Sequence, residues 1–229
     1  MKITTIIKNL SFLLWMLRKR IKSRTVERWV KEYIDIKVET LNIKSTERQF
    51  FLGFIARYGV GKTTVAQKIA EQLPFIHLSS DEGRRLLQQQ GVSSEVVGKE
   101  KLIFFAGFKV IQELMRQRIN ILLDADLRQS HFRKSLQEVV ESEGYNFLLV
   151  HVIARDEVVR ERMKQRQDNE ESAYLRENME RHFMDRKIIH EVEPMPSVFF
   201  TFTNEGKPED LDEQVDKFVS KFKETFNVT

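Results

Sequence analysis

Residues 50–73 constrain the fold more than any other segment of the chain. A short apolar run from Phe50 to Ile55 is typical of a buried strand. A glycine-containing loop follows, and then an amphipathic segment that ends before Pro74. Strand, glycine loop and helix in this order predict a phosphate-binding loop, in which main-chain N–H groups and the positive end of the helix surround phosphate groups.

The loop also carries the side chains that a bound nucleotide needs. Lys62 is placed to reach the outer phosphates, and the hydroxyl of Thr63 is placed to bind magnesium. Ala56 replaces the first glycine of the usual pattern, which removes no phosphate ligand. The segment therefore predicts ATP and Mg²⁺ as cofactors. The expected ATP and phosphate contacts are Tyr58, Gly59, Val60, Gly61, Lys62, Thr63 and Thr64.

Acidic residues follow two further apolar runs. The run 75–78 precedes Asp81, and the run 119–123 leads into Asp124. Near a phosphate loop, carboxylates at strand ends accept a proton from a hydroxyl or hold magnesium. We expect Asp81 to be the general base, or alternatively a helix cap, and Asp124 to bind the metal. Asp126 is interpreted either as a second metal residue or as a cap for the segment after it.

Arginines are expected on both sides of the reaction. Arg84 and Arg85 follow Asp81 and would hold the substrate. Arg162 and Arg166 lie one helical turn apart and would cover the γ-phosphate as part of a lid around residues 155–175. The alternative for the second pair is an ordinary solvated helix face.

The first 24 residues are basic and amphipathic. Seven of the 38 Lys and Arg residues precede the first acidic residue, Glu27. Three interpretations stay open for this helix: it packs on the domain or a second copy of it, it lies on a membrane surface, or it tethers nucleic acid. Its longest apolar run, residues 12–17, is too short to span a bilayer. Because the chain has no Cys, we expect a cytoplasmic protein, either free or peripheral to a membrane.

The 229 residues divide into two expected parts. Residues 1–48 form a helical extension and connector, in which residues 25–48 are read as a helix or a strand. Residues 49–229 form an α/β domain, a three-layer sandwich whose parallel five-stranded sheet lies between helices.

From residue 50 to residue 226 the sequence resembles small P-loop kinases of the predicted-kinase, AAA-type ATPase-like group. This group includes zeta toxins and the kinase domains of polynucleotide kinases. The resemblance covers about four-fifths of the chain. It rests on the segments Gly59–Thr64, Leu78–Asp81 with Arg84, Leu123–Leu127 with Arg133, and Arg155–Arg166.

The resemblance implies roles for individual residues. It makes Asp81 the base for the acceptor hydroxyl, Arg84 a substrate contact, and Arg162 and Arg166 lid arginines. It places Asn204 in a loop near the adenine. The remaining residues expected on the acceptor side are Asp126, which stands where these kinases often have Thr, and Arg133.

The sequence therefore predicts a Mg-ATP-dependent kinase that phosphorylates a hydroxyl of a small-molecule or nucleotide-like acceptor. One alternative is a polynucleotide 5′-hydroxyl kinase, although the near-neutral main domain does not favour nucleic acid as a partner. The other alternative is an ATP-binding switch or adaptor whose residues 1–24 contact a membrane or a partner helix and which transfers no phosphate.

Overall fold

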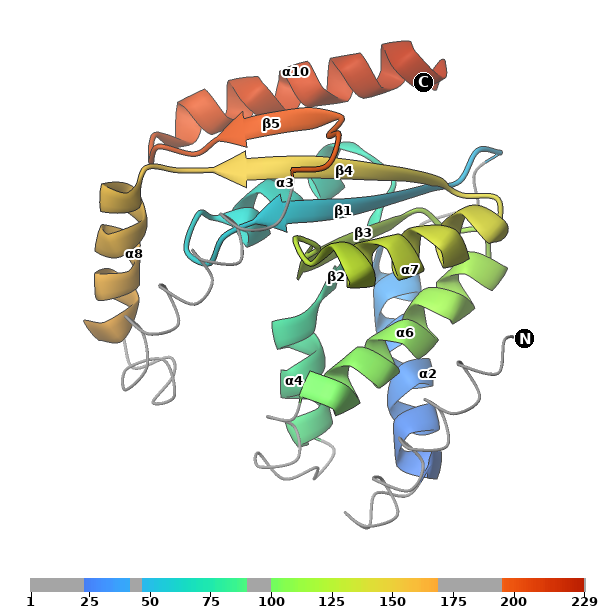
Figure 1. Cartoon of the computed structure of the whole chain (residues 1–229). Coiled ribbons are helices and arrows are strands. Elements are labelled where there is room, and N and C mark those ends of the chain that lie inside the picture. Colours follow the sequence, from blue (N-terminus) through green and yellow to red (C-terminus); the bar gives the residue numbers. More distant parts are fainter. Residues whose placement is uncertain (1–22, 42–46, 90–99, 169–194, 229) are drawn as a thin grey trace. The chain divides into compact units, whose positions relative to one another are not determined.

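The computed structural model describes residues 23–41, 47–89, 100–168 and 195–228 (Figure 1). Residues 1–22 of the expected N-terminal helix and residues 169–175 of the expected lid lie outside these ranges. The described residues form two compact units. The sheet unit comprises the described residues within 46–77 and 120–229, and the helical unit comprises the described residues within 1–45 and 78–119.

A five-stranded sheet forms the centre of the sheet unit. Its spatial order is β2-β3-β1-β4-β5, and β1 pairs in parallel with both β3 and β4, as β4 does with β5. The predicted α/β fold with a parallel five-stranded sheet is confirmed. The strands are β1 (Phe50–Ala56), β2 (Ile76–Ser79), β3 (Ile121–Asp126), β4 (Asn146–Ile153) and β5 (Phe200–Thr203).

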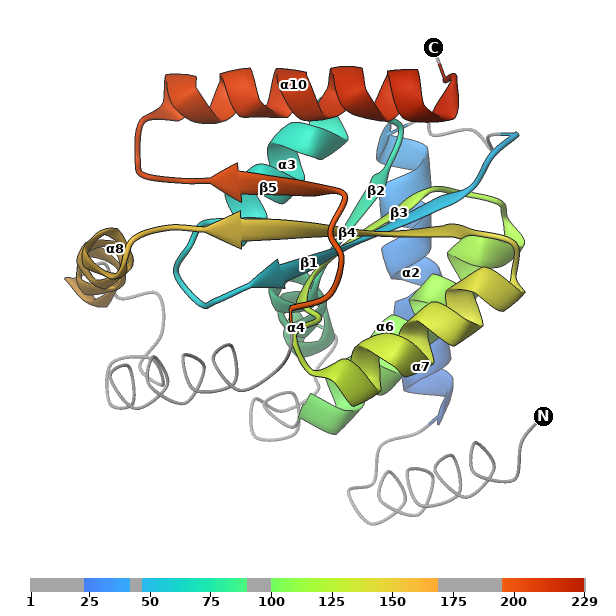
Figure 2. The same ribbon diagram turned by 45° about the horizontal axis from the view of Figure 1, so that its top comes forward.

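Helices cover both faces of this sheet. Two of them, α3 and α10, lie on one face, and α7 lies on the other (Figure 2). The fourth, α8, directly follows β4. The helices of the sheet unit are α3 (Lys62–Gln72), α7 (Ser130–Ser142), α8 (Asp156–Asp168) and α10 (Pro208–Phe226).

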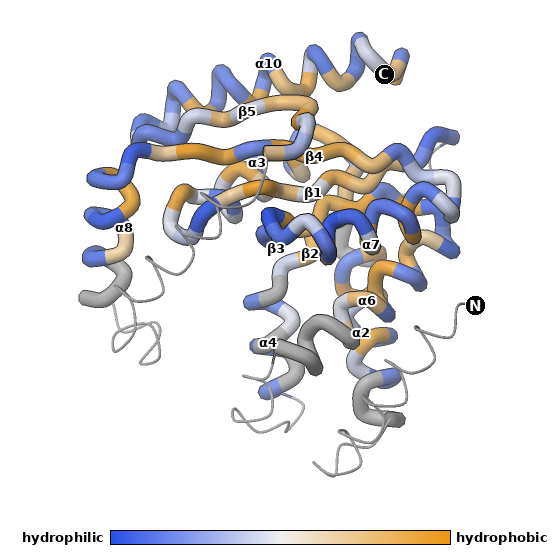
Figure 3. The backbone as a smooth tube through the Cα atoms, viewed as in Figure 1, coloured by the Kyte–Doolittle hydropathy of each residue, from blue (hydrophilic) through white to orange (hydrophobic). Residues whose placement is uncertain are grey.

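Phenylalanines pack between the sheet and the helices on its α3–α10 face. Phe50 of β1 is buried and packs edge to face against Phe222 and Phe226 of α10, with ring centroids 4.8 Å apart in both pairs. Apolar residues run along β1 and β4, whereas polar residues alternate with apolar ones along α10 (Figure 3). Burial of these rings stabilises the element that ends in the phosphate-binding segment, because β1 leads directly into it.

The third strand extends further than the sequence predicts. The expected strand ends at Asp124, but β3 continues through Asp126. The β1–β3 register shifts between Gly53 and Phe54, so that Gly53 faces Leu123 and Phe54 faces Asp126. Both acidic residues thus belong to the strand. α7 begins only at Ser130, and the segment between is capped by Asp126, which accepts a hydrogen bond from the N–H of Arg128.

The helical unit consists of three described helices: α2 (Ser23–Leu41), α4 (Ser80–Gln89) and α6 (Glu100–Arg116). The connecting segment, which the sequence analysis interpreted as either a helix or a strand, is therefore helical over residues 23–41. Asp81 lies in the first turn of α4, which begins immediately after β2. In the part of the chain that the structure describes, no helix is long and apolar enough to cross a membrane.

Candidate functional site

Two glycines give the phosphate-binding segment its shape. Gly59 and Gly61 have φ angles of 82° and 87°, in the left-handed region that residues with a Cβ rarely adopt. Gly61 directly precedes α3, which begins at Lys62. Ala56 instead is the last residue of β1 and is buried in extended backbone, so the departure from the usual first glycine causes no strain. We call residues 57–61 the phosphate loop.

The same glycines let neighbouring elements approach the loop closely. A Cβ on Gly59 would lie 2.8 Å from Cγ1 of Val159 in α8. A Cβ on Gly61 would lie 2.2 Å from Nδ2 of Asn204, the residue after β5. The phosphate loop is therefore packed between its own helix, α8 and the β5–α10 connection.

Asn204 and Arg162 hold the main chain of the phosphate loop. Nδ2 of Asn204 donates a hydrogen bond of 2.9 Å to the carbonyl of Val60, and Nη1 of Arg162 donates one of 3.2 Å to the same oxygen. Nη2 of Arg162 also donates to Oδ1 of Asn204 at 3.0 Å. Asn204 and Val60 are both buried. Arg162 thus contacts the phosphate loop directly, and its expected role as a lid arginine at the γ-phosphate stays a prediction.

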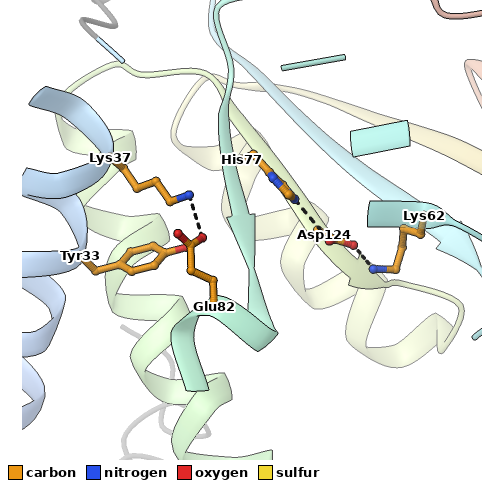
Figure 4. Close-up of polar contacts among 6 residues, drawn as sticks. All are labelled: Tyr33, Lys37, Lys62, His77, Glu82 and Asp124. Carbon is orange, nitrogen blue, oxygen red and sulfur yellow. Dashed lines mark hydrogen bonds and ion pairs between the residues drawn. The ribbon is translucent and has the colours of Figure 1, made fainter. Parts of the chain in front are cut away.

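A lysine and a carboxylate meet beside the loop. Nζ of Lys62 forms an ion pair with Oδ1 of Asp124, and Nε2 of His77 in β2 lies 3.3 Å from Oδ2 of the same side chain (Figure 4). Asp124 is almost fully buried, with 1% of its side chain exposed, whereas Lys62 is 20% exposed. A buried carboxylate needs such partners to stay charged. The pair therefore holds the lysine at the N-terminus of α3, next to the phosphate loop.

Asp126 stabilises the ends of two neighbouring strands. Its Oδ1 accepts a hydrogen bond of 3.0 Å from the main-chain N–H of Arg128 and a longer one of 3.4 Å from that of Ala56. Arg133 acts on the same connection from α7. Its buried Nη1 donates to the carbonyls of Leu127 and Arg128, at 2.9 and 2.8 Å. The observed contacts of Asp126 and Arg133 thus support the main chain, and their expected contact with substrate stays a prediction.

Two ion pairs fix the start of α8. Arg57 in the phosphate loop contacts Asp156 at 2.7 Å and donates to the carbonyl of Ala154 at 3.1 Å. Glu205 accepts hydrogen bonds from the main chain and the Nε of Arg155, at 3.1 and 2.7 Å. The hydrogen bond from the Arg155 side chain lowers the pKa of Glu205 below its ordinary value. The phosphate loop, the start of α8 and the segment after β5 are therefore linked by charged contacts.

The chain matches a known protein family. A family model described as an AAA domain matches residues 57–185, which include the phosphate loop, β3 and α8. The chain belongs to the AAA domain family. Among curated proteins, no relative matches the sequence.

Solved structures share the fold of this AAA domain. A candidate kinase from Chloroflexus aurantiacus is 14% identical, with a TM-score of 0.55 over 76% of this chain and 99% of that one. The PezAT chromosomal toxin–antitoxin system of Streptococcus pneumoniae supplies a chain that is 14% identical, with a TM-score of 0.54 over 90% and 98%. The APS kinase CysC of Mycobacterium tuberculosis, in complex with AMPPNP and APS, is 14% identical, with a TM-score of 0.50 over 78% and 99%. These likenesses and the family match confirm the resemblance drawn from the sequence.

Three of the expected acceptor-side residues lie outside the sheet unit. Asp81, Arg84 and Arg85 belong to α4 of the helical unit, where Asp81 and Arg85 are exposed. Their place at the AAA domain's phosphate loop stays a prediction. Arg166 lies within the bounds of α8, but the structure does not describe its side chain, so its expected role as a lid arginine also stays a prediction.

The oxygen donors present fit magnesium. Thr63 carries an exposed hydroxyl one residue after Lys62, and Asp124 supplies a carboxylate at the adjoining strand. Among the described residues there is no group of three or more His, Cys, Asp and Glu side chains that would form a cage. Magnesium in nucleotide sites uses one or two protein oxygens together with phosphate oxygens and water, so this small donor set suits it.

No sequence pattern assigns His77 to the site. A histidine within a short strand is more often a core or surface residue than a ligand. Its position beside Asp124 depends on β2 lying next to β3 in the sheet, and strand order is not encoded locally. Arg57 was missed for the same reason, since its partner Asp156 is 99 residues away in the sequence.

Proposed function

We propose that the protein is a Mg-ATP-dependent phosphotransferase that phosphorylates a hydroxyl of a small-molecule or nucleotide-like acceptor. The observation that carries this proposal is the arrangement around the phosphate loop. Gly59 and Gly61 provide the backbone shape, Lys62 starts the following helix beside the buried Asp124, and Arg162 contacts the loop carbonyl of Val60. AMPPNP and APS bound to the CysC kinase, a protein of similar fold, support a nucleotide and a small acceptor as the two substrates.

The chain's residues have separate tasks in this reaction. Main-chain N–H groups of the phosphate loop and the N-terminus of α3 bind the phosphates of ATP. Lys62 exchanges its contact with Asp124 for the outer phosphates, and Arg162 adds positive charge where negative charge develops on the transferred group. Tyr58, Thr64 and Asn204 complete the nucleotide side, with Asn204 acting through the carbonyl of Val60.

The transfer itself exchanges one phosphorus–oxygen bond for another. The hydroxyl oxygen of the acceptor attacks the γ-phosphorus, the bond from the γ-phosphorus to the bridging oxygen breaks, and ADP leaves with that electron pair. The hydroxyl proton passes to the carboxylate of Asp81 and from there to water. Arg84, Arg85, Asp126 and Arg133 are proposed to orient the acceptor, and Arg166 to cover the γ-phosphate together with Arg162.

Thr63 and Asp124 would hold magnesium, which supplies charge neutralisation for the phosphate oxygens when bound. Because Lys62 leaves Asp124 for the phosphates, the contact of Asp124 with His77 is the one that would keep the carboxylate directed for this role.

Transfer of labelled γ-phosphate from MgATP tests the proposal. Wild type and Asp81→Asn are each given two acceptor pools, 5′-hydroxyl oligonucleotides and an extract of small metabolites. Asp35→Asn is the matched control, because it is the same substitution at an exposed site on α2. We expect label in the metabolite pool with wild type and with Asp35→Asn, and a loss of about 100-fold or more with Asp81→Asn.

Two other results would change the function proposed. Label in the oligonucleotide pool alone identifies a polynucleotide 5′-hydroxyl kinase. Binding of MgATP by wild type with transfer to neither pool contradicts the phosphotransferase and favours an ATP-binding switch or adaptor. A nucleotide titration without acceptor separates this last result from a simple failure to bind ATP.

A further inference from the structure

A carboxylate of α4 joins that helix to α2 within the helical unit. Oε2 of Glu82 accepts a hydrogen bond of 3.1 Å from the Tyr33 hydroxyl and lies 2.7 Å from Nζ of Lys37 (Figure 4). Both donors come from α2 and meet at a single oxygen atom. Hydrogen bonds to a charged carboxylate are the stronger kind, and two donors one helical turn apart fix its position.

Apolar packing holds the same two helices together. Trp29 and Tyr33 are both 3% exposed, and their rings stack with centroids 5.4 Å apart. A Cβ on Gly83 would lie 3.4 Å from Cζ2 of Trp29, so α4 presents its glycine to the indole ring. The Tyr33–Glu82 hydrogen bond therefore lies at the edge of a buried apolar contact, where it stabilises the helix pair more than it would on an exposed surface.

The Tyr33 hydroxyl acts beside Asp81. Its partner Glu82 directly follows Asp81 in the first turn of α4, the helix that begins after β2. Burial, and then the nearby Glu82 carboxylate, raise the pKa of Tyr33 far above its ordinary value. The hydroxyl accordingly stays protonated and remains a donor to Glu82 throughout the physiological range.

We infer that α2 is a positioning element for the acceptor side of the site: Tyr33 and Lys37, acting through Glu82, hold the β2–α4 junction that carries Asp81. The inference rests on the proposed function of Asp81 as the general base. The residues matched by the AAA domain family begin at residue 57, so α2 lies outside the matched region. Its task is to set the direction of the first turn of α4, while ATP binding is left to the phosphate loop.

Variants of the full chain test this role. Tyr33→Phe keeps the stacked ring but removes the hydroxyl, and Lys37→Met removes the charge. Lys31→Met is the matched control, because Lys31 is an exposed lysine of the same helix. Lys37→Arg is the conservative variant that should rescue the charge.

Three readouts are taken for each variant. Hydrogen exchange of the amides in residues 79–89 reports on the β2–α4 junction whether or not the protein transfers phosphate. Titration with MgATP reports on the phosphate loop, and label transfer to the acceptor pool reports on turnover. We expect Tyr33→Phe and Lys37→Met to speed exchange and to lower turnover by about tenfold, with the KM for ATP unchanged. Lys31→Met and Lys37→Arg should behave like wild type.

The outcomes separate this inference from the proposed function. Unchanged exchange in residues 79–89, or faster exchange with unchanged turnover, would overturn the positioning role of α2. A turnover loss that is matched by an equal loss of MgATP affinity would overturn it too, since the effect would then lie at the phosphate loop. If wild type binds MgATP but transfers no label, the proposed function fails together with the catalytic part of the inference. Hydrogen exchange in residues 79–89 then decides whether α2 holds α4.

Discussion

The side-chain amide of Asn204 donates a hydrogen bond of 2.9 Å to the carbonyl of Val60, although 144 residues separate the two in the sequence. The contact is buried, and Arg162 reinforces it by contacting both partners. It attaches the end of the last strand to the loop that is proposed to bind the phosphates. Two predictions follow from the close fit between this asparagine and the phosphate loop.

Replacing Asn204 by Leu should weaken binding of MgATP by about 5- to 150-fold. The change leaves the Val60 carbonyl with fewer donors and Arg162 without its amide partner, a loss of about 1–3 kcal/mol. Titration calorimetry with a non-hydrolysable ATP analogue measures the effect. Gln214→Ala is the control, because Gln214 bonds to the main chain of Thr203 on the same connection. Equal affinities for wild type and Asn204→Leu would contradict the assigned role.

A methyl group on Gly61 should be far more damaging than one on Gly107. The left-handed backbone of Gly61 costs an alanine about 1–2 kcal/mol, and its Cβ would lie 2.2 Å from Asn204. Around Gly107 of α6, nothing lies within 4 Å of the added atom, so alanine should stabilise the helix by about 0.5–1 kcal/mol. Urea unfolding of Gly61→Ala and Gly107→Ala should thus give free-energy changes of opposite sign. A neutral Gly61→Ala would show that the loop relaxes freely.

Arg133→Met should lower stability rather than acceptor binding alone. The substitution keeps much of the side-chain volume but leaves the carbonyls of Leu127 and Arg128 without the Nη1 donor. We expect a loss of about 1–3 kcal/mol in the free energy of unfolding. Lys134→Met, an exposed neighbour on α7, serves as the control. Wild-type stability combined with a raised KM for the acceptor would instead favour the substrate contact predicted from the sequence.

Alkaline pH should reduce the stability that Tyr33 contributes. Its pKa is raised in the folded protein, so above about pH 10, the ordinary value for tyrosine, the unfolded chain loses a proton that the folded chain keeps. Rising pH then favours unfolding, by at most about 1.4 kcal/mol per pH unit. The stabilisation is complete below pH 10 and declines above it. Unfolding of wild type and Tyr33→Phe between pH 8 and 11 measures this, and a constant difference between the two proteins would contradict it.

The sequence predicts the phosphate loop well because its information is local. A buried strand, glycines at two left-handed positions, Lys62 and a helix all lie within one short segment. The five predicted strands are also found, because each is a short apolar run between polar helices. The importance of Asp124, the partner of Lys62, was also predictable, since Asp124 ends an apolar run of the type expected for a metal-binding strand.

The contacts that complete the site depend on distant parts of the chain. Neither the pairing of His77 with Asp124 nor that of Asn204 with Val60 has a sequence signal, because both follow from strand order in the sheet. The extension of β3 through Asp126 was missed because acids normally end a strand, whereas here main-chain N–H groups satisfy the carboxylate. The amphipathic pattern of α2 indicates a buried face but does not identify α4 as its partner.

Phosphate transfer by Lys62→Met probes the proposed phosphotransferase site at its central residue. The side chain keeps its length but loses the charge proposed to move from Asp124 to the outer phosphates, so label transfer from MgATP should fall by about 100- to 1000-fold. Lys68→Met, at a lysine of the same helix α3 that pairs with Asp212, should retain wild-type transfer. Thermal unfolding of both variants shows that the fold persists. Transfer by folded Lys62→Met at the wild-type rate would contradict the proposed phosphotransferase site.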